Sequence, residues 1–436
     1  MGGVKLVRPR PVNPGVILAP KGARHVAVQR IRAEDAPVTQ AAPPLPLIML
    51  ALMAAHLAGM GAFLTVPVLA PAMAPETGVP ASLAGLHTAL VYAGALVTGP
   101  LTGPLIRRWG GVRMLQISMV VLGCGIALAA LGHPLALAAS AVLAGMGHGP
   151  VTPGGSHLIA AHTPARRRTL VFSLKQAGVP LGAMVVAALA PAIALLAGWR
   201  ASILCMAGIA FVVAIGIQPL RAGLDRDRDR PGASAGLLAV LRESAANLGL
   251  LRTDKELARL TLMACGYGIA QFCFSTFFVA FQVASLGTSL AEAGLRLALA
   301  QAAGVVGRIF WALLADRLGA SRVLAACGVG AALAGLALAF AGPGWPGVLV
   351  AAAGVVMGAT AVGWNGVMLA EAARLAPPGQ VGGATAALSF AFGMTMLVAP
   401  PAFSGLIVLT GGYSAGFLMC VVAAAVGAVA IAGARK

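Results

Sequence analysis

The chain has 436 residues, of which 59% are hydrophobic and only 10% charged, and its formal net charge is +18 at pH 7. Soluble domains carry about 25% charged residues, so this composition excludes a water-soluble fold and indicates a protein whose solvent is lipid. The apolar runs lack the alternation of an outer-membrane barrel, and the positive charges lie in short clusters between the runs. We therefore expect an all-α membrane protein and exclude nucleic acid as its partner.

Residues 1–45 are rich in Arg, Pro and Ala without periodicity, which predicts a disordered cytoplasmic tail rather than a cleaved signal peptide. The alternative is that translation starts further along the chain. Apolar runs of about 20 residues, long enough to cross about 30 Å of hydrocarbon, then follow. Six are expected at 46–71, 82–106, 114–132, 135–160, 170–197 and 201–220, and six more at 258–285, 291–314, 323–341, 347–370, 381–408 and 414–433.

The runs divide the chain into the tail 1–45, an N-terminal six-helix bundle 46–220, a cytoplasmic linker 221–257 and a C-terminal six-helix bundle 258–436. The linker contains alternating charges at 225–230, interpreted as a solvated run, and leucines near helical spacing that fit an amphipathic helix. With the N-terminus inside, 26 of the 30 Lys and Arg residues lie in cytoplasmic segments. The positive-inside rule thus predicts a multi-pass protein of the cytoplasmic (inner) membrane with both termini cytoplasmic.

Two charged segments, 103–113 and 312–322, follow the second and eighth runs and lie 209 positions apart. Leu, two Arg and Gly recur in them at identical offsets. The recurring pairs are Leu105 and Leu314, Arg108 and Arg317, Gly110 and Gly319, and Arg113 and Arg322. This spacing is nearly half the chain length, so it predicts two copies of one unit.

Twelve runs in two sixes, a polar central segment and this repeated loop resemble the major facilitator superfamily over roughly residues 46–433. The family's loop motif is matched by Leu314, Asp316, Arg317 and Gly319 in the second copy, whereas the first copy has Arg107 where the family usually has Asp. The resemblance implies twelve transmembrane helices in two pseudo-symmetric bundles and transport by alternating access. The fourth run has Ala141 where drug/proton antiporters usually have Arg, which disfavours that branch.

By this resemblance, Asp316 would form a conformational latch against the start of the fifth span near Thr169, where a helix N-terminus favours negative charge. Arg107 cannot do the same toward the eleventh span, so the two latches are expected to be unequal. The alternative is that both copies are only charge clusters that set topology. The expected latch residues are Arg107, Arg108, Gly110, Arg113, Asp316, Arg317, Gly319 and Arg322.

Polar residues inside the spans are the candidates for substrate binding, because their burial in lipid is unfavourable. The set is Lys175, Gln176, His148, Thr152, Tyr267, Gln271, Arg308 and Asn365. Lys175 either faces the cavity or extends to the membrane interface, and the seventh-span residues either bind substrate or pack the bundle. His148, Thr152 and Ser156 share helical spacing in a Pro- and Gly-rich fourth span that is expected to be kinked. We expect His56 to be a packing histidine rather than a proton carrier, and His148 is the better candidate if a histidine carries a proton.

Two charged pairs near span ends are expected to be structural, namely Glu292 with Arg296 and Glu371 with Arg374. The spans otherwise offer cations, histidines, amides and hydroxyls without a deep carboxylate. This pattern favours a secondary transporter of a small organic anion, most simply a carboxylate, and the alternative is efflux of neutral or amphipathic compounds.

An enzyme or receptor is disfavoured, because no HExxH, GxSxG or Walker pattern accompanies the spans. We expect no catalytic residues, no cofactor and no metal site, since the six cysteines lie in apolar runs without a CxxC pair. The expected partners are a small-molecule substrate and the lipid bilayer, with a coupling proton left open, and the expected state is a monomer.

Overall fold

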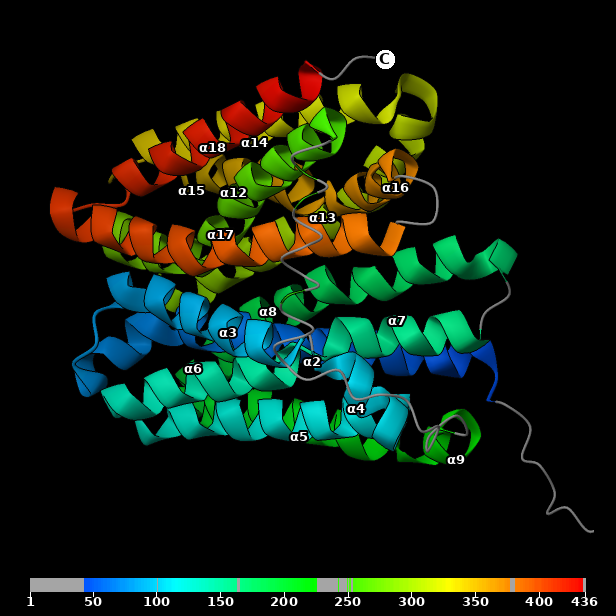
Figure 1. The fold of residues 1–436 in the computed structure, drawn as a ribbon. Coiled ribbons are helices and arrows are strands. Elements are labelled where there is room, and N and C mark those ends of the chain that lie inside the picture. The colour runs from blue at the N-terminus through cyan, green and yellow to red at the C-terminus, as the bar shows by residue number, and fades with distance from the viewer. Residues whose placement is uncertain are drawn as a thin grey trace, which may run out of the picture. The chain divides into compact units, whose positions relative to one another are not determined.

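The computed structural model describes residues 43–99, 101–162, 165–225, 254–376 and 381–433, together with the single residues 242, 249 and 251. Side chains at 160–170, 172–173 and 381–382 lie outside this description, as do residues 1–42 of the predicted tail and most of the predicted linker. In the described part every regular element is a helix, as the composition predicted (Figure 1).

The first group of helices runs from residue 45 to residue 224. Its elements are α2 (Leu45–Thr77), η1 (Ala81–Leu83), α3 (Ala84–Thr98), α4 (Thr102–Trp109), α5 (Gly111–Leu128), η2 (Ala129–Leu131), α6 (Pro134–His148), α7 (Val151–His162), α8 (Ala165–Gly216), η3 (Gln218–Leu220) and α9 (Arg221–Leu224). Helix α8 contains two spans, because Gly198 interrupts it with φ 82° and ψ 160°. Positive φ is a conformation that only glycine adopts at little cost, so the predicted turn between the fifth and sixth spans lies at this residue.

The second group runs from residue 255 to residue 432. It consists of α12 (Lys255–Leu286), α13 (Leu290–Leu318), α14 (Ala320–Phe340), α15 (Gly347–Met357), η4 (Gly358–Val362), α16 (Asn365–Leu375), α17 (Val381–Thr410) and α18 (Ser414–Ala432). Eleven helical stretches in the described residues are long and apolar enough to cross a membrane, and the break at Gly198 makes the longest of them two crossings. The predicted fold class is therefore confirmed.

Two predicted spans differ from the structure in detail. The second ends at Thr98, and the remainder of the predicted run forms the separate short helix α4. In α4, Ile106 is buried while Arg107 and Arg108 are exposed, so this helix is amphipathic and its charged face terminates the span. The tenth span continues from α15 into α16 through the π-helical turn η4. The expected kink of the fourth span is present as the break between α6 and α7.

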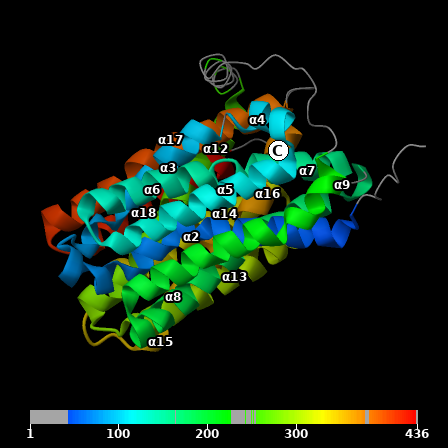
Figure 2. The ribbon, with the colours of Figure 1, turned by 90° about the horizontal axis from the view of Figure 1, so that it is seen from below.

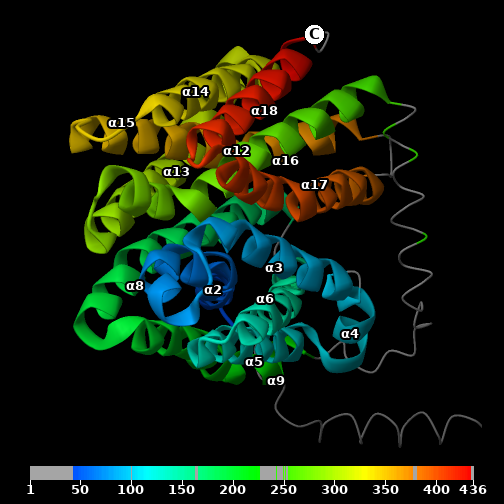
Figure 3. The same ribbon diagram turned by 90° about the vertical axis from the view of Figure 1, so that its left-hand side faces the viewer.

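The helices form two bundles, seen end-on in Figure 3 as a blue-to-green group and a green-to-red group. In the first, α2 packs against α8, and α6 packs against α3 and α5; in the second, α18 packs against α12 and α14. Between the bundles, α8 contacts α13, α3 contacts α17, and α2 contacts α12. Helices α4, α9 and α16 gather at one end, which we call the motif end (Figures 1 and 2).

Positive-φ glycines show that the repeat extends to backbone conformation. Gly78 and Gly287 end α2 and α12 with φ 68° and 65°, and Gly110 and Gly319 precede α5 and α14 with φ 91° and 87°. Each pair is 209 positions apart, the offset of the repeated loop. The two halves of the chain therefore turn in the same way at equivalent positions.

Two close approaches between the bundles repeat at the same offset. A β-carbon at Gly85 in α3 would collide with the carbonyl oxygen of Pro400 in α17. One at Gly294 in α13 would collide with Pro191 in α8. Gly294 follows Gly85 by 209 residues, and Pro400 follows Pro191 by 209. These paired glycine contacts lie near the helix ends remote from the motif end, and they hold the bundles together there.

Candidate functional site

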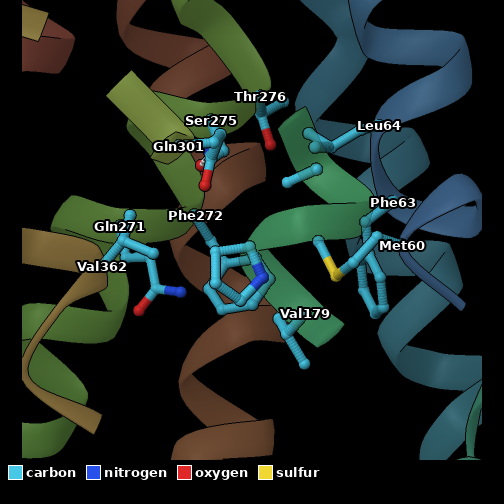
Figure 4. Close-up of a pocket in the computed structure, with 12 residues that line it drawn as sticks. Met60, Phe63, Leu64, Val179, Gln271, Phe272, Ser275, Thr276, Gln301 and Val362 are labelled. Atoms are coloured by element: carbon cyan, nitrogen blue, oxygen red, sulfur yellow. Dashed lines mark hydrogen bonds between the residues drawn. The ribbon is translucent and has the colours of Figure 1, made fainter. Parts of the chain in front are cut away.

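A pocket lies between the two bundles, which we call the central pocket (Figure 4). The first bundle lines it with Met60, Phe63, Leu64, Val179, Pro180 and Ala183, and the second with Gln271, Phe272, Ser275, Thr276, Gln301 and Val362. Only about 10 Å³ remains open to the centre of a water molecule. Pockets for small ligands measure about 300–1,000 Å³, so the bundles are closed around this space.

The polar groups of the central pocket come from the second bundle. The Gln271 Oε1 accepts hydrogen bonds from Trp364 Nε1 and Asn365 Nδ2, both at 3.2 Å. One turn further along α12, the Ser275 hydroxyl accepts a hydrogen bond from Gln301 Nε2 at 3.1 Å. The structure thus brings two predicted candidates, Gln271 and Asn365, together at one wall.

Aromatic rings from both bundles meet beside these amides. Phe63 and Tyr92 of the first bundle contact Phe272 of the second at centroid distances of 5.8 and 5.3 Å, and Phe392 contacts Phe272 at 6.0 Å. All three pairs are edge-to-face, the arrangement that the ring quadrupoles favour. These rings were not predicted as site residues, because an aromatic residue in an apolar run gives no signal of which neighbour it faces.

Arg308 connects the bundles on the motif-end side of the central pocket. Its Nη1 donates to the main-chain oxygen of Gln176 in α8 at 2.7 Å, and its Nε donates to the Val362 carbonyl at 3.3 Å. Among the described residues no carboxylate forms an ion pair with it. The nearby Gln176 Oε1 is buried and accepts no hydrogen bond from any described residue. A guanidinium bonded only to carbonyls retains N–H groups suited to an anion.

Lys175 lies inside the first bundle. It is 1% exposed, and its Nζ donates to the Ser156 hydroxyl at 3.0 Å and to the Thr152 main-chain oxygen at 3.3 Å, both in α7. The structure therefore excludes the interpretation that this lysine extends to the interface, but it does not place Lys175 among the pocket-lining residues. Thr152 contributes its backbone, while its own side chain is exposed.

His148 supports the pocket wall. Its Nδ1 donates to the Gly59 carbonyl at 3.1 Å, and its ring lies edge-on to Phe63 at 4.7 Å. The break between α6 and α7 separates His148 from Thr152 and Ser156, so the predicted single stripe of polar residues is not continuous.

Tyr267 lies away from the substrate-binding position that the sequence predicted for it. Its hydroxyl donates to the Leu324 carbonyl at 2.6 Å, and its ring lies edge-on to Trp364 at 5.6 Å. The side chain is fully buried within the second bundle, where it packs over Gly328 and Gly427. The structure therefore shows packing at Tyr267, the alternative that helical spacing left open.

The expected latch at Asp316 is not formed in the described residues, where the exposed carboxylate has no hydrogen-bond or ion-pair partner. The Thr169 side chain lies outside those residues. Arg107 and Arg108 are also exposed, with Arg108 over the Trp109 ring at 6.0 Å. The conformational role of these residues stays a prediction.

A carboxylate that the sequence did not single out lies beside the first copy of the repeated loop. Asp225 is 4% exposed, and its two oxygens accept hydrogen bonds from the backbone N–H groups of Val112 and Arg113 at 2.8 and 3.0 Å. A β-carbon at Gly110 would collide with this carboxylate. The interpretation of Asp225 as part of a solvated charge run is wrong, because the unpaired N–H groups that begin α5 bind it.

Both predicted structural ion pairs are confirmed. Arg296 pairs with Glu292, and Arg374 pairs with Glu371 at 2.6 Å. Arg296 also donates to Gln282 Oε1 at 3.1 Å. Arg296 and Arg308 lie on the same helix and differ in their partners: the first has a carboxylate, whereas the second has only carbonyl oxygens in the described residues.

Comparison with known proteins supports a membrane-transporter fold. A family model described as Major Facilitator Superfamily matches residues 260–435. The fold is similar to a crystal structure of a mutant of the nucleoside transporter NupG, with a TM-score of 0.71 and 14% identity, over 89% of this chain and 99% of that one. The second half of the chain thus resembles the major facilitator superfamily in sequence, and the chain as a whole resembles a nucleoside transporter in fold.

The chain is 26% identical over 301 residues to the 4-hydroxybenzoate transporter PcaK of Acinetobacter baylyi. That alignment covers 62% of this chain and 66% of the relative. These matches confirm the predicted resemblance to the major facilitator superfamily, and the proteins matched are transporters rather than enzymes, as expected.

Proposed function

We propose that the chain is a secondary transporter that carries a small organic carboxylate across the cytoplasmic membrane by alternating access. The observation that carries the proposal is Arg308, a cation at the bundle interface whose described partners are two carbonyl oxygens. Charged residues within spans mark substrate pathways, and a guanidinium binds a carboxylate through two parallel hydrogen bonds. The Gln176 Oε1 beside it adds a buried amide that can rotate to donate.

The walls of the central pocket favour an aromatic or similarly flat acid. Phe63 and Phe272 offer ring faces and edges, while the Gln301–Ser275 pair offers hydrogen bonds to a polar substituent away from the carboxylate. The similarity to a 4-hydroxybenzoate transporter supports this class, because that compound combines a ring, a carboxylate and a hydroxyl. We propose Gln271 and Asn365 as further substrate contacts on the same wall.

The closure of the bundles supports an alternating-access cycle. The paired glycine contacts hold one end together, while the Arg308–Gln176 bond crosses the bundles on the other side of the pocket. Binding of a carboxylate would replace the carbonyl partner of Arg308 and thereby release that crossing. We propose further that the motif end is cytoplasmic, that both termini lie on that side, that a proton is the coupling ion, and that one chain is the functional unit.

The test is uptake of radiolabelled 4-hydroxybenzoate into proteoliposomes, with neutral 4-hydroxybenzamide as the matched compound without charge. We expect the acid to be transported and Arg308→Gln to lower its uptake about tenfold or more, since a hydrogen bond to a charged group contributes about 1.5–3 kcal/mol. Arg296→Gln is the matched control and should retain most uptake, because Arg296 is paired with Glu292.

The alternative, efflux of neutral or amphipathic compounds, is favoured by the apolar first-bundle wall of the pocket. Transport of the benzamide as fast as the acid, with Arg308→Gln unaffected, would overturn the carboxylate proposal and establish that alternative.

A further inference from the structure

A buried histidine lies behind the central pocket with one ring nitrogen uncommitted. His56 in α2 is 2% exposed, and its Nδ1 lies 2.8 Å from the Leu52 carbonyl oxygen. A carbonyl only accepts hydrogen bonds, so the proton of the neutral ring is on Nδ1 and the lone pair is on Nε2. This Nε2 is buried, and within the described residues it has no hydrogen-bond partner. Such a group is rare in a folded protein and calls for an explanation.

The groups that face His56 are basic. The charged or titratable groups that influence it electrostatically are Lys175 of α8, His148 of α6 and Arg308 of α13, and in the described part of the chain no acidic group does so. In α7, Gly155 lies beside both side chains: its β-carbon position would be 3.3 Å from Lys175 Cδ and 3.5 Å from His56 Cε1. The lysine stem and the imidazole ring therefore meet over a glycine that leaves room for both.

We propose that His56 Nε2 binds the proton that accompanies the transported anion. The inference rests on the proposed function. One bond forms, between the Nε2 lone pair and a proton from solution, and the Nδ1–H bond to Leu52 stays in place. Lys175 and Arg308 would repel a further positive charge on His56 while the pocket lacks an anion.

A carboxylate bound at Arg308 offsets this repulsion and makes protonation of Nε2 favourable. Because binding linkage is reciprocal, protonation must increase the affinity for the anion by the same factor as the bound anion increases the affinity for the proton. The pair then crosses the membrane together. The chain would in this way couple an anion to a proton without a carboxylate in the middle of its described spans.

The chain offers a matched control in His87 of α3. This histidine is also buried within a span, and its Nδ1 has no hydrogen-bond partner among the described residues. Among the described residues, no charged group has an electrostatic effect on this imidazole. It lies two residues from Gly85, at the closed end of the bundles. His87 therefore shares the burial of His56 but lacks its basic neighbours.

The experiment measures proton uptake by the purified full chain when 4-hydroxybenzoate binds near pH 7, using an indicator dye in weak buffer and a separate binding assay. We expect the native chain and His87→Gln to take up a proton with the anion, and His56→Gln to bind the anion without proton uptake. Affinity should rise about fivefold or more between pH 8 and pH 6 in the native chain and stay flat in His56→Gln.

The outcomes separate the two proposals. Failure of the native chain to bind or transport the acid counts against the proposed function. Binding without proton uptake, or uptake that persists in His56→Gln, overturns the assignment of His56 alone. If His56→Gln does not fold, nitrogen-15 spectra of the native chain decide the matter. In the spectra of His87→Gln and of His148→Gln, one histidine signal must still convert to imidazolium when the anion is added. If no histidine converts, the inference is overturned.

Discussion

At the scale of single residues, three buried charges in this chain are held mainly by backbone or hydroxyl groups. Asp225 is bonded to two N–H groups, Arg308 to two carbonyls, and Lys175 to a carbonyl and the Ser156 hydroxyl. A buried charge needs hydrogen bonds to compensate for its lost hydration. The Asp225 contact begins a helix and is structural, whereas the Arg308 contact crosses between bundles that must separate.

Substitution of Asp225 by alanine should lower the stability of the first bundle. The variant leaves the N–H groups of Val112 and Arg113 without their acceptor, and loss of a helix-capping acceptor costs about 0.5–2 kcal/mol. Thermal unfolding of the purified chain measures the effect. Glu76→Ala is the control, because Glu76 forms an exposed pair with Arg200 of a kind that contributes about 0–1 kcal/mol. An equal loss in both variants would contradict the buried cap.

Part of the candidate site could be predicted from the sequence, and the rest could not for physical reasons. Arg308, Gln271 and Asn365 could be predicted, because polar side chains within apolar runs are unfavourable in lipid. Tyr267 shares helical spacing with Gln271, but α12 is surrounded by other helices, so spacing alone cannot say which neighbour a face meets. Phe272 gave no signal, since an aromatic ring is equally suited to a core and to a pocket.

At the scale of helices, the spans could be predicted because hydrocarbon thickness sets their length. Their interruptions followed local chemistry: Gly198 turns the chain between the fifth and sixth spans, and Gly149 and Pro150 separate α6 from α7. The contacts between helices could not be predicted. Gly85 and Gly294 look like any other glycines in sequence, and only the structure shows that they face prolines across the interface.

Gly85→Ala should weaken closure at the end of the bundles remote from the motif end. The added β-carbon would collide with the Pro400 carbonyl, so the helices must separate and the opposite access state is favoured. The measurement is the alkylation rate of a single cysteine introduced at Ser404, which should increase. Gly405→Ala, in the same α17 but with open space around it, should leave the rate unchanged. No increase for Gly85→Ala would show that this contact does not control closure.

A further prediction at the scale of helices concerns the expected latch at Asp316. If Asp316 binds the start of α8 when the motif end closes, Asp316→Asn should favour the state in which these helix ends are apart. Disulfide crosslinking between cysteines placed at Arg317 and Arg168 should then become slower. Glu76→Gln serves as the control, since it removes an exposed carboxylate charge outside both copies of the loop. Equal crosslinking rates would leave only the topological role for both segments.

At the scale of the whole molecule, the closed central pocket predicts a carrier rather than a channel. The pocket leaves only about 10 Å³ open to water, so the bundles must separate for a substrate to enter it and again for the substrate to leave. Proteoliposomes preloaded with unlabelled 4-hydroxybenzoate should therefore take up labelled compound faster than empty ones. A receptor would show binding without this counterflow, and a channel would show no acceleration by preloading.

The paired glycine contacts also bear on how such a molecule could arise. Gly85 meets Pro400 and Gly294 meets Pro191. Exchanging each residue for its counterpart 209 positions away therefore turns one contact into the other. In a homodimer of a single half, one glycine and one proline would form both contacts at once through the two-fold axis, as isologous interfaces require. After fusion of the two copies, each contact became free to vary separately. The two surviving contacts therefore have the geometry expected of an ancestral dimer interface.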